Sequence, residues 1–422
     1  MSISELEARI EGFSTEIERH KEVLSELERS KSHAQRQLNA LRDPLARIPV
    51  EISSEIFLHC VPTRSSLGRH HIPTLFLTIC HGWSDIAVSI PALWAAIYID
   101  LSEAAQGLET TVGNWLERAR GHLLDVCLMG LMRETNQQVA ELIWQYSGQL
   151  KSLDIDFANV DAHGHEDFEY RPLGDSGPQH PLPFLRTLTI GGHEELGCSW
   201  RPIHRLLSLA PHLVEFEASN MSFHDIPSPF VTELVLPNLR RLELSNAAAL
   251  EWHTDILRWF STPRLQNLSL PGASQDAVPF LQRLSPPLRR FRANIRTSPR
   301  GMNPRLQPIL QLMPTLTHLE LEFPSRDSET ELFTILAEDP SMVPNLASLS
   351  LVNANIPSDS IWKMLVRAVS ARHHKLRSIR INSLTNEASE ETLAALRALL
   401  ADGVDIQVLR WYDFGPNLLL SE

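Results

Sequence analysis

One short pattern recurs through most of the chain and limits what the chain can fold into. In the stretch PNLRRLELSN, at positions 237–246, Leu239 is followed by leucines three and five positions later. Leu242 and Leu244 are two residues apart, so they share one face of an extended strand. A strand this short buries that face only against neighbouring strands. The rest of the chain must therefore supply further strands of the same kind.

The same spacing of three apolar residues recurs through the chain until its carboxy-terminal end. The copies begin at Leu123, Leu150, Leu185, Leu213, Leu239, Leu265, Leu288, Leu316, Leu346, Leu376 and Ile406. Successive copies start 23 to 35 residues apart, in or near the period of leucine-rich repeats. In seven copies a proline stands two residues before the first leucine, where it precedes the strand and removes no ladder hydrogen bond.

Segments with helical spacing, such as DSIWKMLVRAVSA, lie between these copies. Strand and helix thus alternate, which predicts an α/β fold with one parallel sheet. Several copies lack the Asn or Cys that usually ends the strand of this repeat. We therefore predict a divergent leucine-rich-repeat solenoid over residues 99–422.

Residues 3–41 carry a different pattern, a heptad repeat. Large apolar residues hold nine of its twelve core positions, and charged residues surround them, as in a coiled coil. Two interpretations stay open: a homodimeric coiled coil, parallel or antiparallel, and a long amphipathic helix packed on the protein's own body. His20 and Lys31 hold core positions, where they weaken self-association or fix its register. Pro44 disfavours a helical residue before it, so we expect one helical domain over residues 1–43.

The composition restricts the partners that the protein can have. A formal net charge of −13 argues against a general nucleic-acid binder, because phosphate contact requires a basic surface. No apolar run approaches the roughly 18 residues of a membrane span, and the charged amino terminus does not read as a cleavable signal. The four cysteines form no C-x-x-C pair, which indicates free thiols in a reducing compartment. We expect an intracellular protein, cytoplasmic or nuclear, with no membrane partner.

Between the heptads and the repeats, residues 44–98 read as two or three short helices around a polar spacer. This region resembles an F-box-like domain, in the version that opens many fungal F-box proteins. The residues that carry the resemblance are Leu45, Pro49, Glu51, Ile52, Ile56, Phe57, Cys80, Trp83, Ile86, Pro91, Leu93 and Trp94. The family begins with a leucine-proline pair, where this chain has Ile48 and Pro49.

The resemblance implies an adaptor of a cullin-based, SCF-type ubiquitin ligase. F-box proteins dock through this domain onto a Skp-family subunit, and their repeats hold a protein substrate. The contacts to that subunit would come from Leu45, Pro49, Ile52, Ile56, Phe57 and Trp83, with Trp83 shared between the core and the interface. Each of these residues could instead belong only to the core. A protein-interaction scaffold that does not recruit the ligase is the alternative function.

The strand register predicts where a substrate would bind. If Leu242 and Leu244 point inward, Arg241 and Glu243 point outward onto the concave face of the solenoid. The same register exposes acidic residues on the early strands, a basic pair next, acidic residues again and a basic end. We predict that a protein or peptide substrate of mixed charge contacts Arg241, Glu243, Arg290, Arg292, Glu320, Glu322 and Arg380. The alternative is that these charged side chains are only exposed to solvent and contact no substrate.

No motif of a known catalytic centre is present. The sequence contains no phosphate-binding G-x-x-x-x-G-K-S/T, no H-E-x-x-H and no G-x-S-x-G. We therefore expect neither an enzyme nor a bound cofactor. The densest group of metal-ligand types is Asp154, Asp156, Asp161, His163, His165, Glu166 and Asp167. Most of it falls in the longest gap between repeats, so we interpret it as a solvated loop and predict no metal site.

Overall fold

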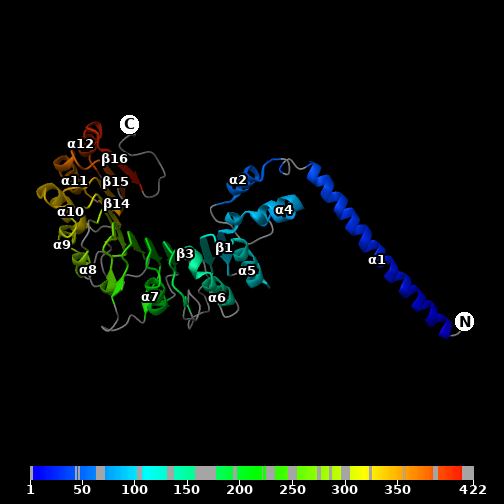
Figure 1. The fold of residues 1–422 in the computed structure, drawn as a ribbon. Helices are drawn as coiled ribbons and strands as arrows, with labels where there is room; N and C mark the ends of the chain where they lie inside the picture. The colour runs from blue at the N-terminus through cyan, green and yellow to red at the C-terminus, as the bar shows by residue number, and fades with distance from the viewer. Residues whose placement is uncertain are drawn as a thin grey trace. The chain divides into compact units, whose positions relative to one another are not determined.

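The computed structural model of the 422-residue chain has a mixed α/β fold, which confirms the predicted fold class. Two compact units are present: Met1–Tyr98 with Thr111–His122, and Ile99–Thr110 with Leu123–Glu422. Figure 1 shows the elements along the chain. The residues that the structure describes are 3–42, 45, 48–62, 72–101, 107–130, 137–156, 177–192, 197–220, 222–224, 233–245, 254–272, 277–284, 288–295, 305–322, 326–354, 356, 358–383 and 388–410.

The first unit opens with a single long helix, α1 (Ile3–Arg42). Its length of 40 residues agrees with the extent of the heptad repeat. The large apolar side chains on it that the structure describes are exposed, and they include Ile10, Ile17, Leu24 and Leu27. The heptad stripe on α1 therefore has no partner within the described part of the chain.

Short helices follow α1 in the first unit. They are α2 (Val50–Cys60), α3 (Phe76–Ile79), α4 (His81–Ser89), the 3-10 turn η2 (Pro91–Trp94) and α5 (Leu108–Arg118). Trp94 and Trp115 pack edge to face with ring centroids 5.1 Å apart. The indole of Trp115 donates to the Trp94 carbonyl at 2.9 Å, and the Trp94 indole donates to the Ala87 carbonyl at 2.9 Å. Both buried indoles are thus satisfied, as buried tryptophans require.

The second unit is built on a sheet whose spatial order follows the chain order. Neighbouring strands from β2 to β16 pair in parallel. The strands are β1 (Ala96–Asp100), β2 (Leu124–Met129), β3 (Leu150–Asp156), β4 (Thr187–Gly191), β6 (Glu215–Ser219), β9 (Arg241–Ser245), β11 (Asn267–Leu270), β12 (Arg290–Asn294), β13 (His318–Glu322), β14 (Ser348–Ala354), β15 (Ser378–Ser383) and β16 (Asp405–Arg410). This order is that of a solenoid.

Each of the eleven predicted strands is present, and β1 is an additional strand. Residues 96–98, which were expected to end the helical region, form the first part of β1. Ile97 and Ile99 are buried on one face of β1, with the period of two that a strand requires. The hydrophobic core of the sheet continues this alternation: Leu242 and Leu244 are buried, whereas Arg241 is exposed.

The prolines before the strands lie in turns. In six copies, the first leucine of the repeat donates its amide to the carbonyl three residues earlier, as Leu239 does to Leu236 at 3.3 Å. The proline then stands one residue after the accepting carbonyl, the position in a turn where its fixed φ is favourable. The next amides reach the preceding repeat, where Arg240 donates to the Val214 carbonyl at 2.8 Å. The turn thereby aligns each strand with the one before it.

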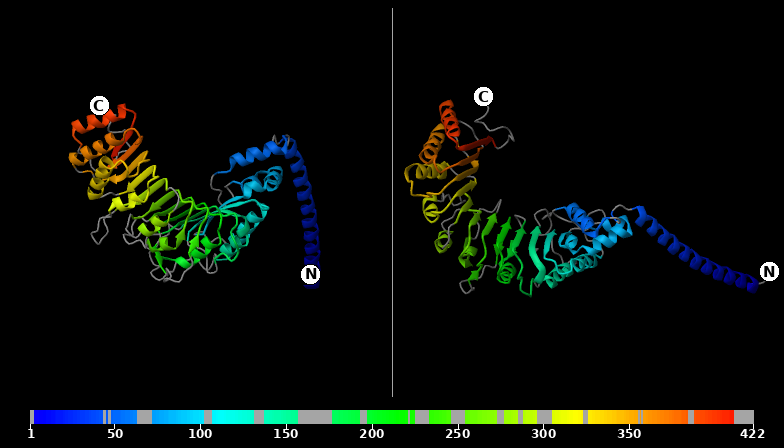
Figure 2. Two further views of the ribbon diagram at one scale, coloured as in Figure 1. Left: turned by 60° about the vertical axis from the view of Figure 1, so that its left-hand side comes forward. Right: turned by 45° about the horizontal axis from the view of Figure 1, so that its top comes forward.

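Helices occupy the outer side of the curved sheet in this unit (Figure 2). They are α6 (Gln137–Gln145), η4 (Ser147–Gln149), α7 (Trp200–Ser208), η5 (Thr254–Trp259), α8 (Val278–Arg283), α9 (Leu306–Gln311), α10 (Arg326–Glu338), α11 (Asp359–Arg372) and α12 (Glu390–Ala401). Two short parallel pairs join β5 (Gly197–Ser199) to β7 (Ser222–His224) and β8 (Leu234–Val235) to β10 (Phe260–Ser261).

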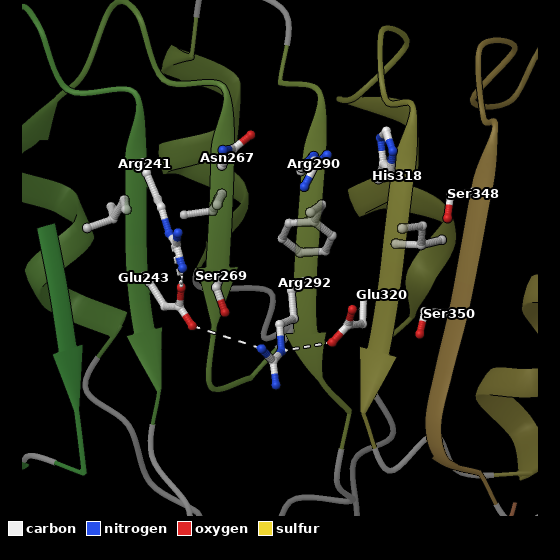
Figure 3. A pocket seen from close by; sticks show the side chains of 14 residues that line it. Arg241, Glu243, Asn267, Ser269, Arg290, Arg292, His318, Glu320, Ser348 and Ser350 are labelled. Atoms are coloured by element: carbon white, nitrogen blue, oxygen red, sulfur yellow. Dashed lines mark hydrogen bonds and ion pairs between the residues drawn. The ribbon is translucent and has the colours of Figure 1, made fainter. Parts of the chain in front are cut away.

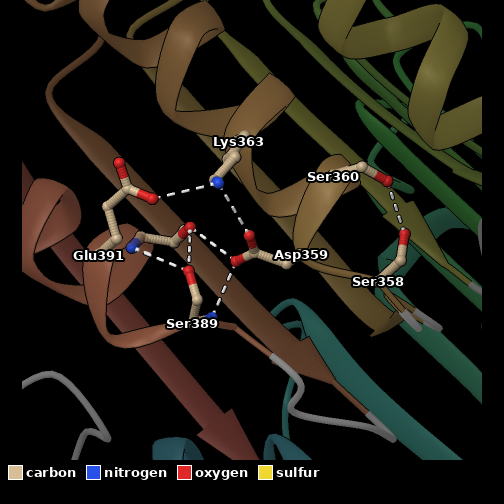
Figure 4. Close-up of polar contacts among 7 residues, drawn as sticks. Ser358, Asp359, Ser360, Lys363, Ser389 and Glu391 are labelled. Atoms are coloured by element: carbon tan, nitrogen blue, oxygen red, sulfur yellow. Dashed lines mark hydrogen bonds and ion pairs between the residues drawn. The ribbon is translucent and has the colours of Figure 1, made fainter.

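A polar cluster ties the beginnings of α11 and α12 together (Figure 4). The Asp359 carboxylate accepts from the Ser389 amide at 2.8 Å and from the Thr392 hydroxyl at 2.7 Å. Lys363 lies 3.2 Å from Asp359 and 3.2 Å from Glu391. These donors, the Ser389 amide first, hold the pKa of Asp359 well below its usual range. Successive repeats are therefore joined by side chains as well as by the sheet.

Candidate protein-interaction sites

Helix α2 exposes a group of large apolar side chains. Val50 and Ile52 are each 52% exposed, and Ile56 is 41% exposed. Pro49 is exposed at the beginning of the helix and accepts the amides of Ile52 and Ser53 at 3.0 and 3.2 Å. We call Ile52 and Ile56, which lie four residues apart on one side of the helix, the α2 surface. Adjacent exposed apolar groups of this size suit a partner that removes them from water.

Another side of α2, about 100° round the helix, packs into the core, and it corrects one prediction. Phe57 is 1% exposed, so its predicted direct contact with a partner is replaced by the core position that was the alternative. Its ring stacks on Phe76 with centroids 4.2 Å apart and packs against Trp83 at 5.2 Å. Phe57 lies one residue after Ile56, about 100° further round the helix, which turns it into the core. Ser53 is buried on the same side and donates to the Leu45 carbonyl at 3.3 Å.

Trp83 and Leu45 take intermediate positions. Both side chains are half-buried, and Trp83 also packs edge-on against Phe76 with centroids 5.8 Å apart. Trp83 is therefore placed in the aromatic core with part of its ring accessible. Sequence reasoning missed Val50 and also Ile79, which is exposed at the end of α3. Apolar content alone could not separate these residues from their buried neighbours.

The second surface is the outward face of the sheet in the other unit. Strand pairing sets its residues in rows that run from strand to strand (Figure 3). The first row reads Glu215, Arg241, Asn267, Arg290, His318, Ser348, Ser378 and Asp405 from β6 to β16. The second row reads Asp154, Thr189, Glu217, Glu243, Ser269, Arg292, Glu320, Ser350, Arg380 and Gln407 from β3 to β16.

Arg292 is the centre of an ion-pair network on this face. Its guanidinium lies 3.1 Å from the Glu320 carboxylate and 3.9 Å from the Glu243 carboxylate. It also donates a short hydrogen bond to the Glu322 carboxylate. Arg241 pairs with the same Glu243 at 2.7 Å. The bonds to carboxylates raise the pKa of Arg292 against the opposing effect of burial. Arg292 was predicted to contact substrate, and in the structure its guanidinium binds carboxylates of its own chain.

Arg290 differs from its two neighbouring arginines. It is exposed on β12, and the described residues place no carboxylate within ion-pair distance of it. His318 stands beside it in the first row. Burial, and then the charge of Arg290, lower the pKa of His318 below its ordinary value. Arg290, His318 and Asn267 line a shallow hollow of about 260 Å³.

The early strands carry excess negative charge. Glu217 on β6 is surrounded by Glu243, Asp154 and Glu215, with Arg241 as the opposing cation. Burial, followed by the charge of Glu243, raises the pKa of Glu217. The described part of this face carries acidic residues on the early strands and then the basic pair, as predicted. Among the described residues, Arg292 is paired with carboxylates and Arg290 is not.

Other predicted positions are placed as follows. Arg380 is exposed on β15 opposite Ser350 and Gln407. The side chain of Arg410, the whole of Tyr412 and the acidic and histidine cluster at 161–167 lie outside the described residues. Sequence reasoning missed Asn267, Ser269, Ser348 and Ser350, because it followed charges along the face. The period-two register of the same leucines would have found all four.

In the part of the chain that the structure describes, no group of three or more His, Cys, Asp or Glu side chains is placed to hold a metal ion. Nor does any of its described helices combine the length and apolarity needed to cross a bilayer. A comparison of the sequence with models of protein families and with curated proteins finds no match in either.

Proposed function

We propose that this protein is a substrate-recruiting adaptor of a cullin-based ubiquitin ligase. In this proposal the α2 surface docks a Skp-family subunit and the outward sheet face binds a protein substrate. The observation that carries it is the exposure of Ile52 and Ile56, on the helix where the F-box-like sequence pattern expects the subunit contact. Together they offer apolar area whose burial stabilises a complex by about 25 cal/mol for each Å².

The placement of Phe57 refines the predicted contact set. Its ring stacks on Phe76 in the core beneath α2. The direct contacts would therefore come from Pro49, Ile52 and Ile56, together with half-buried Trp83. The adaptor needs no catalytic residue of its own, since it only brings a substrate to the ligase.

Co-purification with a Skp-family subunit tests the docking half of the proposal. Ile52→Asp places a charge on the apolar area and should abolish capture of the subunit, while circular dichroism and the melting temperature stay as in the wild type. Val235→Asp is the matched control, because Val235 is a similarly exposed apolar residue on β8, outside both proposed interfaces. If the wild type captures no subunit, or if Ile52→Asp captures it equally well, the adaptor proposal is rejected in favour of a scaffold.

The exposed stripe of α1 fits a second copy of the same chain. The heptad repeat supplies the seam of a two-stranded coiled coil. In a parallel pair, Glu16 of one chain faces Lys21 of its copy; in a fully overlapped antiparallel pair, Lys21 faces Lys21. Charge therefore favours the parallel arrangement. Cysteine introduced at Ile10 should then give a disulfide-linked dimer under mild oxidation, whereas the unaltered chain gives none. A monomeric full-length chain in sedimentation rejects self-association.

A further inference from the structure

Among the described residues, Arg290 has no carboxylate partner on the sheet face, although two nearby arginines do. Arg241 and Arg292 are both held by carboxylates, whereas the described residues offer Arg290 no such partner. The carboxylates nearest in the second row, Glu243 and Glu320, are already engaged by Arg292. Exchange of partners to neutralise Arg290 would break that network. Within the described part of the chain, the charge of Arg290 is therefore not neutralised by an ion pair.

The residues on either side of Arg290 are neutral groups that can donate hydrogen bonds. Asn267 and His318 flank it directly in the first row, and Ser348 follows His318. From β11 to β15 this row contains no carboxylate. All four residues line the same hollow, and Figure 3 shows them along one level of the sheet. Donors arranged around one arginine suit a compact oxyanion.

The hydrogen bonds of His318 fix which ring nitrogen faces a ligand. The Thr317 hydroxyl has one proton, and it donates to the Arg289 carbonyl at 2.9 Å. It therefore accepts from His318 Nδ1, which lies 2.9 Å away. The titrating proton of this imidazole is then the one on Nε2. A bound oxyanion favours that proton, whereas Arg290 opposes it.

We infer that Arg290, Asn267, His318 and Ser348 form a subsite for an oxyanion, either a carboxylate or a phosphate, presented by the protein substrate. Only the source of the anion, a protein substrate, depends on the proposed function; the subsite itself does not. The charged groups around His318 are Arg290 on β12, Glu320 two residues along β13, and Arg292, which binds Glu320. Since Glu320 is paired with Arg292, the bound anion is the counter-charge of Arg290. Affinity should rise as pH falls through the pKa of His318.

The test measures the pKa of the His318 imidazole by NMR in the full chain, with His318→Gln identifying its signal. Inorganic phosphate and acetate are added in separate arms, and chloride at equal ionic strength gives the screening background. In the wild type, phosphate, acetate or both should raise the pKa of His318 above its value in chloride. The arm that acts identifies the oxyanion.

Three variants make the result specific. Arg290→Gln should remove the rise and weaken binding of the active anion at least about tenfold, the loss expected for a charged hydrogen bond. Arg290→Lys should restore part of the rise, and Arg380→Gln, another exposed arginine of the same face, should leave it unchanged. An unchanged pKa in both arms of the wild type, or a full rise in Arg290→Gln, overturns the subsite. Either result leaves the outcome of the co-purification test unchanged, because that test measures binding at the α2 surface.

Discussion

The α2 surface and the outward sheet face satisfy their side chains in opposite ways. On α2, Ile52 and Ile56 are exposed apolar side chains, and they contribute favourable free energy only when a partner removes them from water. On the sheet, Glu243, Arg292 and Glu320 already bind one another, so a partner must compete with bonds that exist. Under the proposed function, the α2 surface would supply affinity through buried apolar area. The sheet face would supply specificity, because paired charges favour only a partner with matching charges.

The largest effect should follow from a change behind the α2 surface rather than on it. Phe57→Ala removes a ring that is 1% exposed and stacked on Phe76, and it should destabilise the first unit by about 3–5 kcal/mol. Ile56→Ala, one residue away but exposed, should cost less than about 1 kcal/mol. Thermal and urea unfolding measure both. Equal losses would show that the two sides of α2 are not divided as described.

The second prediction contrasts how the two surfaces respond to salt. Capture of a Skp-family subunit through Ile52 and Ile56 should change little between low and high ionic strength, because apolar burial is not screened. Substrate binding across Arg290 should weaken as salt rises past roughly 0.1 M, where the Debye length is about 10 Å. Affinities measured for both partners at matched salt concentrations check this. Parallel salt slopes would remove the distinction between the surfaces.

The ion-pair network predicts a smaller effect on folding. Arg292→Gln leaves Glu243, Glu320 and Glu322 close together without their shared cation, and it should destabilise the second unit by about 1 kcal/mol. Arg290→Gln removes an unpaired charge of the same strand and should leave the unfolding midpoint unchanged. Urea titrations of the two variants give the comparison. A larger loss for Arg290 would mean that the pairing was assigned to the wrong arginine.

Asp359 should make stability depend on acid. Its pKa is depressed by the Ser389 amide and the Thr392 hydroxyl, so the charged form is favoured in the folded state. The contribution to stability is present above the ordinary carboxyl pKa and is lost as pH falls toward the depressed folded value. Asp359→Asn should lower stability at neutral pH and flatten this acid dependence. Melting temperatures across the acid range measure the slope.

Glu217 should show the opposite sign and the smallest effect. Burial and Glu243 raise its pKa, so its charged form is disfavoured in the folded chain. Its contribution is favourable below the unfolded pKa and is lost as pH rises through the folded pKa. Glu217→Gln should therefore raise stability by a few tenths of a kcal/mol at neutral pH, after allowance for solvent screening. A decrease would mean that Glu217 is held by a cation in the native state.

The sequence was sufficient for features that repeat. The three-apolar spacing located the strands of the long sheet after β1, since burial of Leu242 and its equivalents imposes the period directly, but it did not locate the short pairs β5–β7 and β8–β10. It missed β1 because Ile97 and Ile99 alternate without the leading leucine of the other copies. Contacts between side chains of different strands were harder to predict from the sequence. Arg292 pairs with carboxylates from β9 and β13, and no local pattern says which of several nearby charges it selects.

Helix α2 shows the limit of residue type as a guide. Ile56 and Phe57 are adjacent, large and apolar, and the sequence assigned both to the docking surface. Only the positions of Phe76 and Trp83, which come after the polar spacer, decide that Phe57 is the core residue. The orientation of a short helix is thus set by distant segments. Its own periodicity defines two faces but does not say which one is covered.

The register of the sheet has a consequence for how the recognition surface can change over generations. Each strand contributes one side chain to each row, and the buried leucines that hold the strand are separate from the side chain displayed. A mutation at Asn267 or Ser348 alters one position of the row and leaves the core packing alone. If this face binds a partner, single substitutions on one strand can change its specificity without changing the core. After a gene duplication, the two copies could therefore acquire different partners while keeping the same fold.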